Sequence, residues 1–183
     1  LLPPSMQTKF DDCPRLTVQQ RHIYFSISAD IEDYVEKIRN PIYKICFVLQ
    51  LGYFRASGKF FANDLFRSVD IKFVCNSLDI TIPKLNIDAK MYSVDTRYLH
   101  KNYILKTSGW QKFTKKHYND LHEELSLHAK QQIHPKSLLP IATNYLINRK
   151  IELPMYYMLA EIITDVYNKI EDVLVNIVDK SLS

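Results

Sequence analysis

Apolar residues recur at helical spacing over much of the chain, and the pattern is strongest at residues 41–57. Pro41 suits the first position of a helix, because the N–H that proline lacks would have no intrahelical partner there. Apolar residues then occupy most of the helix circumference, which is typical of a helix at the centre of a core. Gly58 supplies the stop.

Caps and breakers divide the rest of the chain into further helices. Ser28, Ser93 and Thr114 are suitable N-cap residues. Helices are expected at about residues 17–24, 28–38, 69–78, 84–91, 94–106, 115–131, 135–149 and 154–180. Asn63 can begin a short additional helix. The helices at 69–78 and 84–91, joined by a tight connection, look like a helix-turn-helix, although an ordinary helical hairpin gives the same pattern.

The expected fold is therefore all-α, with two small helix-turn-helix-like units followed by a long C-terminal helix. Residues 1–16 should form an extended lead-in because they are rich in proline. The first helical unit should cover residues 17–91. A second, basic unit should cover residues 92–153, and the long helix should occupy residues 154–183.

Apolar residues of the long helix are spaced by 4, 3, 4, 3 and 4 positions. They are Leu159, Ile163, Val166, Ile170, Val173 and Ile177. This spacing predicts a seam that packs on neighbouring helices or pairs with a second helix. A helical module for protein interaction or dimerisation through this seam is therefore the alternative to the function developed below.

Composition and cysteine usage fit a folded protein without membrane spans. Hydrophobic residues make up 46% of the chain, while glycines number only three. The longest apolar run falls far short of the roughly 20 residues that cross a bilayer, and no signal peptide is recognisable. Three cysteines without a Cys-x-x-Cys pair indicate reduced thiols in the cytoplasm. Cys46 and Cys75 lie in apolar helical patterns, which predicts buried core positions.

Catalytic signatures are missing from the sequence. His122 and His128 flank a Glu-Glu pair but stand six positions apart, whereas two histidines that clamp zinc from one helix stand four apart. The chain has no Gly-x-Ser-x-Gly, no P-loop and no dinucleotide fingerprint. We therefore expect no catalytic residue, no metal and no cofactor, and a small hydrolase is disfavoured.

Charge is distributed unevenly along the chain. Residues 1–83 carry 10 Lys and Arg against 9 Asp and Glu, residues 84–150 carry 12 against 5, and residues 151–183 carry 2 against 6. A basic middle block between a neutral start and an acidic end is a candidate surface for a polyanion such as DNA or RNA. A solvated lysine-rich face gives the same composition.

The basic block contains the candidate nucleic-acid contacts. Phosphate contacts are expected from Lys101, Lys106, Lys112, Lys115, Lys116 and Lys150, and Arg149 can contribute in the same way. Base-edge or register contacts are expected from Arg97, His100 and the helix that carries Lys84 and Lys90. Trp110 and Phe113 are expected to be core residues rather than base-stacking groups.

The sequence RNPIYKICFVLQLGYFRASGKF at residues 39–60 resembles a segment near the N-terminus of Tn-three family transposases, the replicative transposases of bacterial mobile elements. The matching or nearly matching residues are Arg39, Pro41, Lys44, Ile45, Phe47, Leu49, Gln50, Leu51, Tyr53, Phe54, Arg55, Gly58, Lys59 and Phe60. Tyr43 and Cys46 depart from the family pattern, which has Asn and Gly there.

Weaker matches follow in the family's order and extend the resemblance over about residues 21–178. They are the segment 73–78, Tyr92, Thr96, Arg97, His100, the corner at 109–113 and the Ile-Glu-Leu-Pro turn at 151–154. The resemblance implies a helical module that binds double-stranded DNA at the terminal inverted repeats of a transposon. The family's RNase-H-like catalytic domain lies downstream, and nothing in this chain matches it. Such a protein would work in the bacterial cytoplasm, at the nucleoid.

Overall fold

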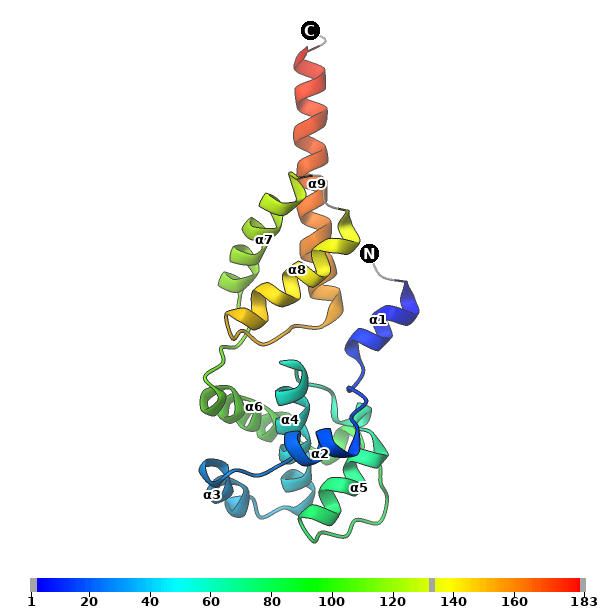
Figure 1. Cartoon of the computed structure of the whole chain (residues 1–183), viewed down its shortest axis with the longest axis vertical. Helices are drawn as coiled ribbons and strands as arrows, with labels where there is room; N and C mark the ends of the chain where they lie inside the picture. Colours follow the sequence, from blue (N-terminus) through cyan, green and yellow to red (C-terminus); the bar gives the residue numbers. More distant parts are fainter. Residues whose placement is uncertain (1–2, 132–133, 182–183) are drawn as a thin grey trace. The chain divides into compact units, whose positions relative to one another are not determined.

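The computed structural model describes residues 3–131 and 134–181, and its regular elements are helices. They are α1 (Pro4–Asp11), α2 (Val18–Tyr24), α3 (Ala29–Lys37), α4 (Pro41–Ser57), η1 (Asn63–Leu65), α5 (Ser68–Ser77), η2 (Ala89–Met91), α6 (Val94–Ser108), α7 (Lys115–Ala129), α8 (Pro135–Asn148) and α9 (Tyr156–Ser181) (Figure 1). The all-α prediction is confirmed.

The helices gather into two compact units. Asp12–Trp110 forms the α2–α6 unit, whereas Leu1–Asp11 and Gln111–Ser183 together form the α7–α9 unit, which includes α1. This division differs from the expected boundary after residue 91, because Ile104 and Leu105 place α6 in the same core as α4. Each unit has a hydrophobic core of its own.

Helix α4 is the centre of the α2–α6 unit, and α2, α3, α5 and α6 all pack on it (Figure 1). Every residue from Ile45 to Phe54 is buried. The Asn40 side chain caps the helix by accepting the N–H groups of Ile42 at 2.9 Å and Tyr43 at 3.2 Å. Gly58 ends it in the left-handed region with φ of 69°. The predicted central helix and both of its ends are confirmed.

Two polar residues of α4 hold neighbouring loops. The fully buried Gln50 side chain donates to the Phe61 carbonyl at 2.6 Å and accepts the Phe61 N–H at 3.3 Å. Arg55 donates to the carbonyls of Tyr24 at 3.1 Å and Ser26 at 2.5 Å. Burial lowers the pKa of this guanidinium. These hydrogen bonds hold the segment after α2 and the segment after α4 against α4.

A buried carboxylate joins three helices of the same unit. Asp70 on α5 accepts hydrogen bonds from Arg21 Nε of α2 at 2.6 Å and from the Tyr53 hydroxyl of α4 at 2.7 Å. Asp70 is 0% exposed, so the bonds operate in a region of low dielectric. Burial raises the pKa of the nearby Cys13 thiol to about 12, which keeps it protonated and unreactive. Cys46 and Cys75 are also buried, as predicted.

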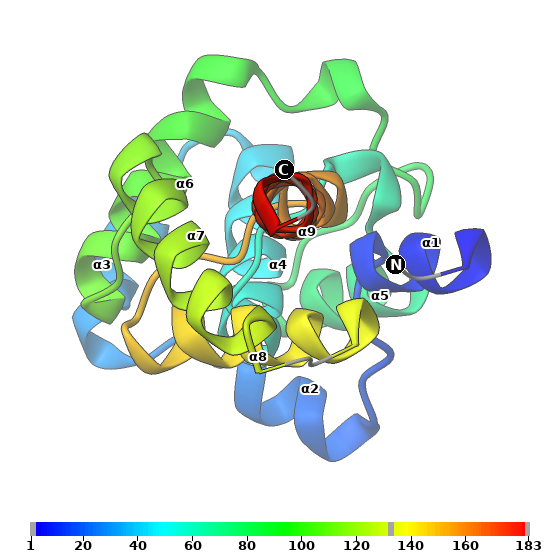
Figure 2. The ribbon, with the colours of Figure 1, turned by 90° about the horizontal axis from the view of Figure 1, so that it is seen from above.

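In the α7–α9 unit, α9 packs against α1, α7 and α8. Figure 2 views α9 end-on. Leu159, Ile163 and Val166 of the predicted seam are buried in this core, and Ile170 packs on its edge. The remaining seam positions, 173 and 177, lie outside the residues whose side chains are described. The first half of the seam is therefore occupied within the unit.

The expected extended lead-in at residues 1–16 is wrong over half of its length, because Pro4–Asp11 forms α1. Pro4 supplies the preset φ of a first helical position, and the Pro3 carbonyl accepts the N–H groups of Met6 and Gln7. The Asp11 carboxylate then accepts the N–H of Tyr156 at 3.0 Å and caps the start of α9.

The helix expected at residues 84–91 does not form, and with it the predicted helix-turn-helix is lost. Within residues 79–93 the helical part is the single turn η2. Pro83 restricts the residue before it, and the buried Asn63 side chain donates to the carbonyls of Ile87 at 3.2 Å and Asp88 at 2.7 Å. The Ile87 carbonyl is thus held by a side chain, and the Asp88 carbonyl accepts both this side chain and the Met91 N–H of η2, at 2.9 Å.

Gly52 provides a test of packing around α4. A Cβ at this position would overlap Cδ1 of the Phe25 ring. Glycine to alanine in a helix usually stabilises by about 1 kcal/mol, but here overpacking should dominate. We expect Gly52→Ala to lower the free energy of unfolding by about 1–3 kcal/mol in urea denaturation. Asn76→Ala on the exposed side of α5 is the control, and a stable Gly52→Ala would contradict the packing.

Asp70 provides a test of the buried ion pair. Asp70→Ala leaves Arg21, which is 13% exposed, without its carboxylate. We expect a loss of about 3–5 kcal/mol in the free energy of unfolding. Asp33→Ala at an exposed position of α3 should change stability by less than about 0.5 kcal/mol. Equal losses in the two variants would show that the pair contributes nothing.

Candidate nucleic-acid interface

The predicted contact residues divide between the two units. The α7–α9 unit carries Lys112, Lys115, Lys116, Arg149 and Lys150. The α2–α6 unit carries Lys84, Lys90, Arg97, His100, Lys101 and Lys106. Each unit therefore carries its own group of predicted contact residues.

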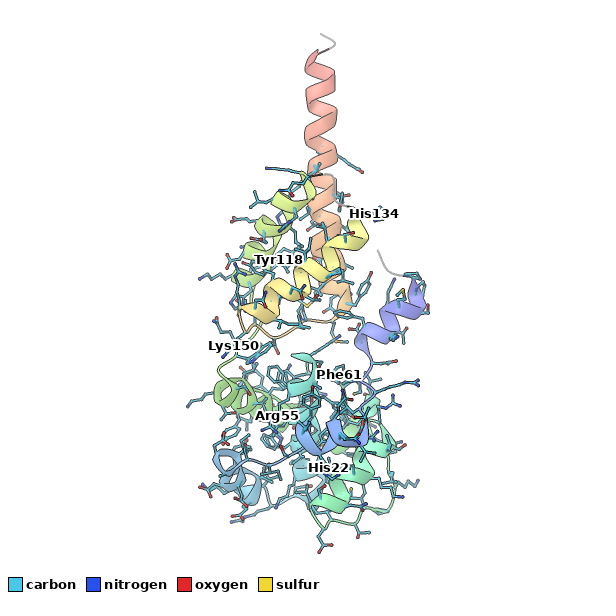
Figure 3. All side chains as sticks on the ribbon, viewed as in Figure 1. His22, Arg55, Phe61, Tyr118, His134 and Lys150 are labelled. Atoms are coloured by element: carbon cyan, nitrogen blue, oxygen red, sulfur yellow. The ribbon has the colours of Figure 1, made fainter. Side chains whose placement is uncertain are left out.

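A short backbone pairing brings the first group together. The Gln111 N–H donates to the Lys150 carbonyl at 2.8 Å, and the Glu152 N–H donates to the Gln111 carbonyl at 2.9 Å, which forms an isolated parallel bridge between Gln111 and Ile151. Lys150 has a φ of 53° in the turn after α8, where Figure 3 labels it. The segment that enters α7 consequently lies beside the segment that leaves α8.

We call the five residues of this group the basic corner: Lys112, Lys115, Lys116, Arg149 and Lys150. All five are exposed. The neighbouring acid turns inward, because Glu152 is 8% exposed and its carboxylate accepts the Phe113 N–H at 3.1 Å. Phe113 itself packs on the core of the unit, as predicted. The corner therefore presents five exposed cationic side chains.

Aromatic rings support two of these cations. The Lys115 ammonium lies 4.3 Å from the centre of the Tyr118 ring, and the Arg149 guanidinium lies 3.7 Å from the Tyr145 ring. A cation over an aromatic face keeps its charge while its side chain loses freedom. The binding of an anion then costs less side-chain entropy, because these two side chains are already ordered.

The position of two lysines disfavours the helix that carries them. Lys115 and Lys116 open α7, and its first turn contains no acidic residue. A cation at a helix N-terminus opposes the helix dipole and costs about 0.3–1 kcal/mol when exposed. Helix stability therefore does not explain these lysines, whereas an anion at this end would interact favourably with both the lysines and the dipole.

In the α2–α6 unit, the predicted cations are exposed or half-buried on α6 and the preceding loop. Lys84 and Lys90 are exposed, but they lie in the loop and in η2 rather than on the expected helix. Arg97 and Lys101 are half-buried, and the Lys101 ammonium lies 4.6 Å from the centre of the Phe60 ring. Lys106, near the end of α6, is exposed.

His100 is a correction, because it is 4% exposed and cannot contact DNA. Its Nδ1 is hydrogen-bonded to the Tyr92 hydroxyl at 2.5 Å, and its ring lies edge-on to Phe47 at 5.1 Å. Burial lowers the pKa of His100 to about 4, so the ring is neutral at neutral pH. The spacing to Ile104, one turn later on the same face, was the sequence signal that could have revealed this.

Sequence reasoning also missed the outer face of α6. Val94 is 68% exposed, Tyr98 is 53% exposed and Leu99 is 62% exposed. No motif singled out these residues, because apolar residues on a helix are normally counted as core. Trp110, just after α6, is half-buried and packs on the core of the α2–α6 unit, edge-on to Phe54 at 5.0 Å.

A polar notch between α7 and α9 has mixed charge and no evident catalytic arrangement. The hydroxyl of Tyr118, which Figure 3 labels, donates to Asp165 at 2.9 Å. The Lys169 ammonium lies 3.3 Å from His122 Nε2. Burial and Lys169 lower the pKa of His122. In the parts of the chain that the structure describes, no three His, Cys, Asp or Glu side chains are placed to hold a metal. None of the described helices is long and apolar enough to cross a membrane.

The fold and this surface define a small helical domain with an exposed cluster of cations. The model of one protein family, described as a domain of unknown function (DUF4158), matches residues 1–166. The chain therefore belongs to this family. The match covers the whole α2–α6 unit, the basic corner and the beginning of α9. No curated protein matches the chain.

The buried His100 predicts a pH dependence of stability. Because the pKa of His100 is about 4 in the folded chain against 6.5 in the unfolded chain, the unfolded chain binds more protons between these values. Stability attributable to this residue should be full above pH 6.5 and fall by about 3 kcal/mol on acidification to pH 4.

Urea denaturation of the wild type and of His100→Phe at several pH values measures this effect. The difference between the two proteins isolates His100 from the carboxylates that titrate in both. We expect the wild type to lose more stability than the variant between pH 6.5 and pH 4. Parallel pH profiles would show that His100 is not buried in its neutral form.

Proposed function

We propose that this chain is a module that binds double-stranded DNA, and that the basic corner contacts the phosphates. The single observation that carries the proposal is the corner itself, where the bridge between Gln111 and Ile151 gathers five exposed cations from two segments far apart in the sequence. Cations in one cluster repel each other, and a polyanion relieves this repulsion. The cations of the protein then replace the counterions condensed on the polyanion, and the release of these counterions favours binding.

The arrangement suits a nucleic-acid backbone better than a small anion. The corner is an exposed surface with cations on two segments, whereas small-ligand sites are concave and mostly apolar. Phosphates along a duplex present one negative charge per roughly 1.7 Å of helix axis, so several cations can be neutralised together. Such contacts hold the protein on DNA and set its register, and they carry no sequence information directly.

The resemblance to Tn-three family transposases makes the proposal more specific. By this resemblance, the DNA is the terminal inverted repeat of a transposon, and the chain is the N-terminal recognition part of a bacterial transposase that acts at the nucleoid. Phosphoryl transfer would then belong to the RNase-H-like domain of that enzyme. Gln50 and Arg55, both in the resembling segment, bind backbone carbonyls within the α2–α6 unit. This segment therefore supports the fold, and the proposed DNA contacts lie elsewhere.

The salt dependence of binding tests this function. The triple variant with Lys112→Gln, Lys115→Gln and Lys116→Gln should bind a duplex of about 30 base pairs from the inverted repeat beside the source gene more weakly than the wild type. The slope of log affinity against log salt should flatten by about 0.9 for each phosphate that the variant no longer neutralises. Fluorescence anisotropy over a series of NaCl concentrations measures both quantities.

The matched control removes the same number of charges elsewhere. Lys37, Lys72 and Lys130 are exposed and lie outside the corner, so their change to glutamine alters net charge equally. The control should keep almost the full slope. Equal effects of both triple variants would show that only net charge matters, and binding that ignores salt would exclude the proposed phosphate contacts.

A further inference from the structure

Helix α8 presents one contiguous uncharged face to solvent. Its inner side is buried in the core of the α7–α9 unit through Leu138, Ala142 and Leu146. The exposed residues are spaced by 3, 4, 3 and 1 positions and are Ser137, Pro140, Asn144, Ile147 and Asn148. At about 100° of rotation per residue they fall within one sector of about 100°. We call these five residues the amide face.

Two asparagines dominate the amide face. Asn144 and Asn148 stand one helical turn apart, so their side chains succeed one another along α8. Both are exposed, and no described residue is hydrogen-bonded to either amide. Asparagine forms helices less well than alanine, lysine or glutamate, so helix stability does not explain Asn144 in the interior of α8. The donors and acceptors of both amides are available to a ligand.

Charge around the amide face favours a polyanion. Residues 125–151 contain no Asp or Glu, although the solvent face of a helix usually carries charged residues. The cations of this stretch are Lys130, Lys136, Arg149 and Lys150. A phosphate backbone that approaches α8 therefore meets no carboxylate of this helix, and it is attracted by the cations that follow it.

The amide face is continuous with the basic corner. Arg149 and Lys150 follow Asn148 directly, and Figure 3 labels Lys150 at this end of α8. The Arg149 guanidinium lies 3.7 Å from the centre of the Tyr145 ring, so it lies along α8 rather than away from it. In a DNA complex, phosphate contacts set the register of a helix whose side chains reach base edges. The corner and the amide face are placed for these two tasks.

We propose that the amide face of α8 reads base edges in the major groove of double-stranded DNA, an inference that rests on the proposed function. The groove is about 12 Å wide and admits an α-helix. Asn144 and Asn148 each pair with an adenine, whose N6 and N7 match the acceptor and donor of a side-chain amide. Ile147, which is 41% exposed, contacts a thymine methyl group.

The two surfaces contribute differently to binding. The basic corner consists of cations, which neutralise phosphates of any sequence. The amide face has no charge and carries the groups that distinguish one base pair from another. Affinity for any duplex should therefore depend on the corner, and preference for one sequence should depend on Asn144 and Asn148.

Selection from a duplex library supplies the probe. The full chain enriches binding duplexes from a library with about 20 randomised base pairs, roughly two helical turns of DNA. The enriched duplex and its scrambled version are then compared by fluorescence anisotropy. Asn144→Ala and Asn148→Ala should each weaken binding to the enriched duplex by about 10-fold or more. Their binding to the scrambled duplex should stay the same.

A repeated selection locates the loss. Each variant should enrich duplexes that have lost the preference for adenine at one position of the wild-type sequence, because only the pair read by the missing amide becomes free to vary.

The matched control is Asn168→Ala, which removes the same side chain from an exposed helical position on α9 of the same unit. It should keep the affinity and the preference of the wild type, and thermal melts check that every variant is folded. The triple variant of the basic corner should weaken binding to the enriched and scrambled duplexes by the same factor.

Each other outcome overturns a defined statement. If Asn144→Ala and Asn148→Ala enrich the wild-type sequence, α8 does not read bases although the chain binds DNA. If the wild type binds every duplex equally, the proposed function stands and the inference falls. If the wild type binds no duplex, both fall. If the α8 variants change sedimentation of the free chain but not DNA binding, the amide face contacts a second copy instead.

Discussion

The α2–α6 unit depends on one buried carboxylate. Asp70 binds Arg21 and Tyr53 at the same time, so α2, α4 and α5 can reach their native positions only together. A buried charge without these partners would carry a large desolvation penalty, which excludes packings that separate the three helices. Hydrophobic burial drives the unit together without fixing directions, whereas this pair of hydrogen bonds selects one arrangement. The position of α6 follows from the α4 that this arrangement holds, because α6 packs on α4.

Local signals in the sequence were sufficient for most helices. Asn40 and Pro41 begin α4 and Gly58 ends it, while Ser93 and Gly109 bound α6, because each of these effects acts within a few residues. Local sequence signals gave the wrong prediction where a residue far away in the sequence determines the local structure or the burial. The loop at 79–93 depends on Asn63, α1 depends on its fit to α9, and the burial of His100 depends on Phe47 of another helix.

The candidate site shows the same limit. The lysines of the basic corner could be found by counting charges, because an excess of cations in one stretch of sequence is visible without the fold. It did not show that Lys112 and Lys150 lie on paired segments, because the bridge that joins them is a tertiary contact. Nor did it find the outer face of α6, where apolar periodicity normally indicates core. The exposure of Val94 and Leu99 becomes visible only when the position of the helix is known.

The Asp11 cap of α9 has a consequence for the order of folding. The α2–α6 unit is an insertion between α1 and the rest of the unit to which α1 belongs. During synthesis α1 emerges before the inserted unit, yet its partner Tyr156 lies 145 positions after Asp11 and emerges when the inserted unit is already complete. Since domains generally fold as units while the chain is made, the unit with the basic corner should close last and should be sensitive to changes in α1, on the far side of the insertion.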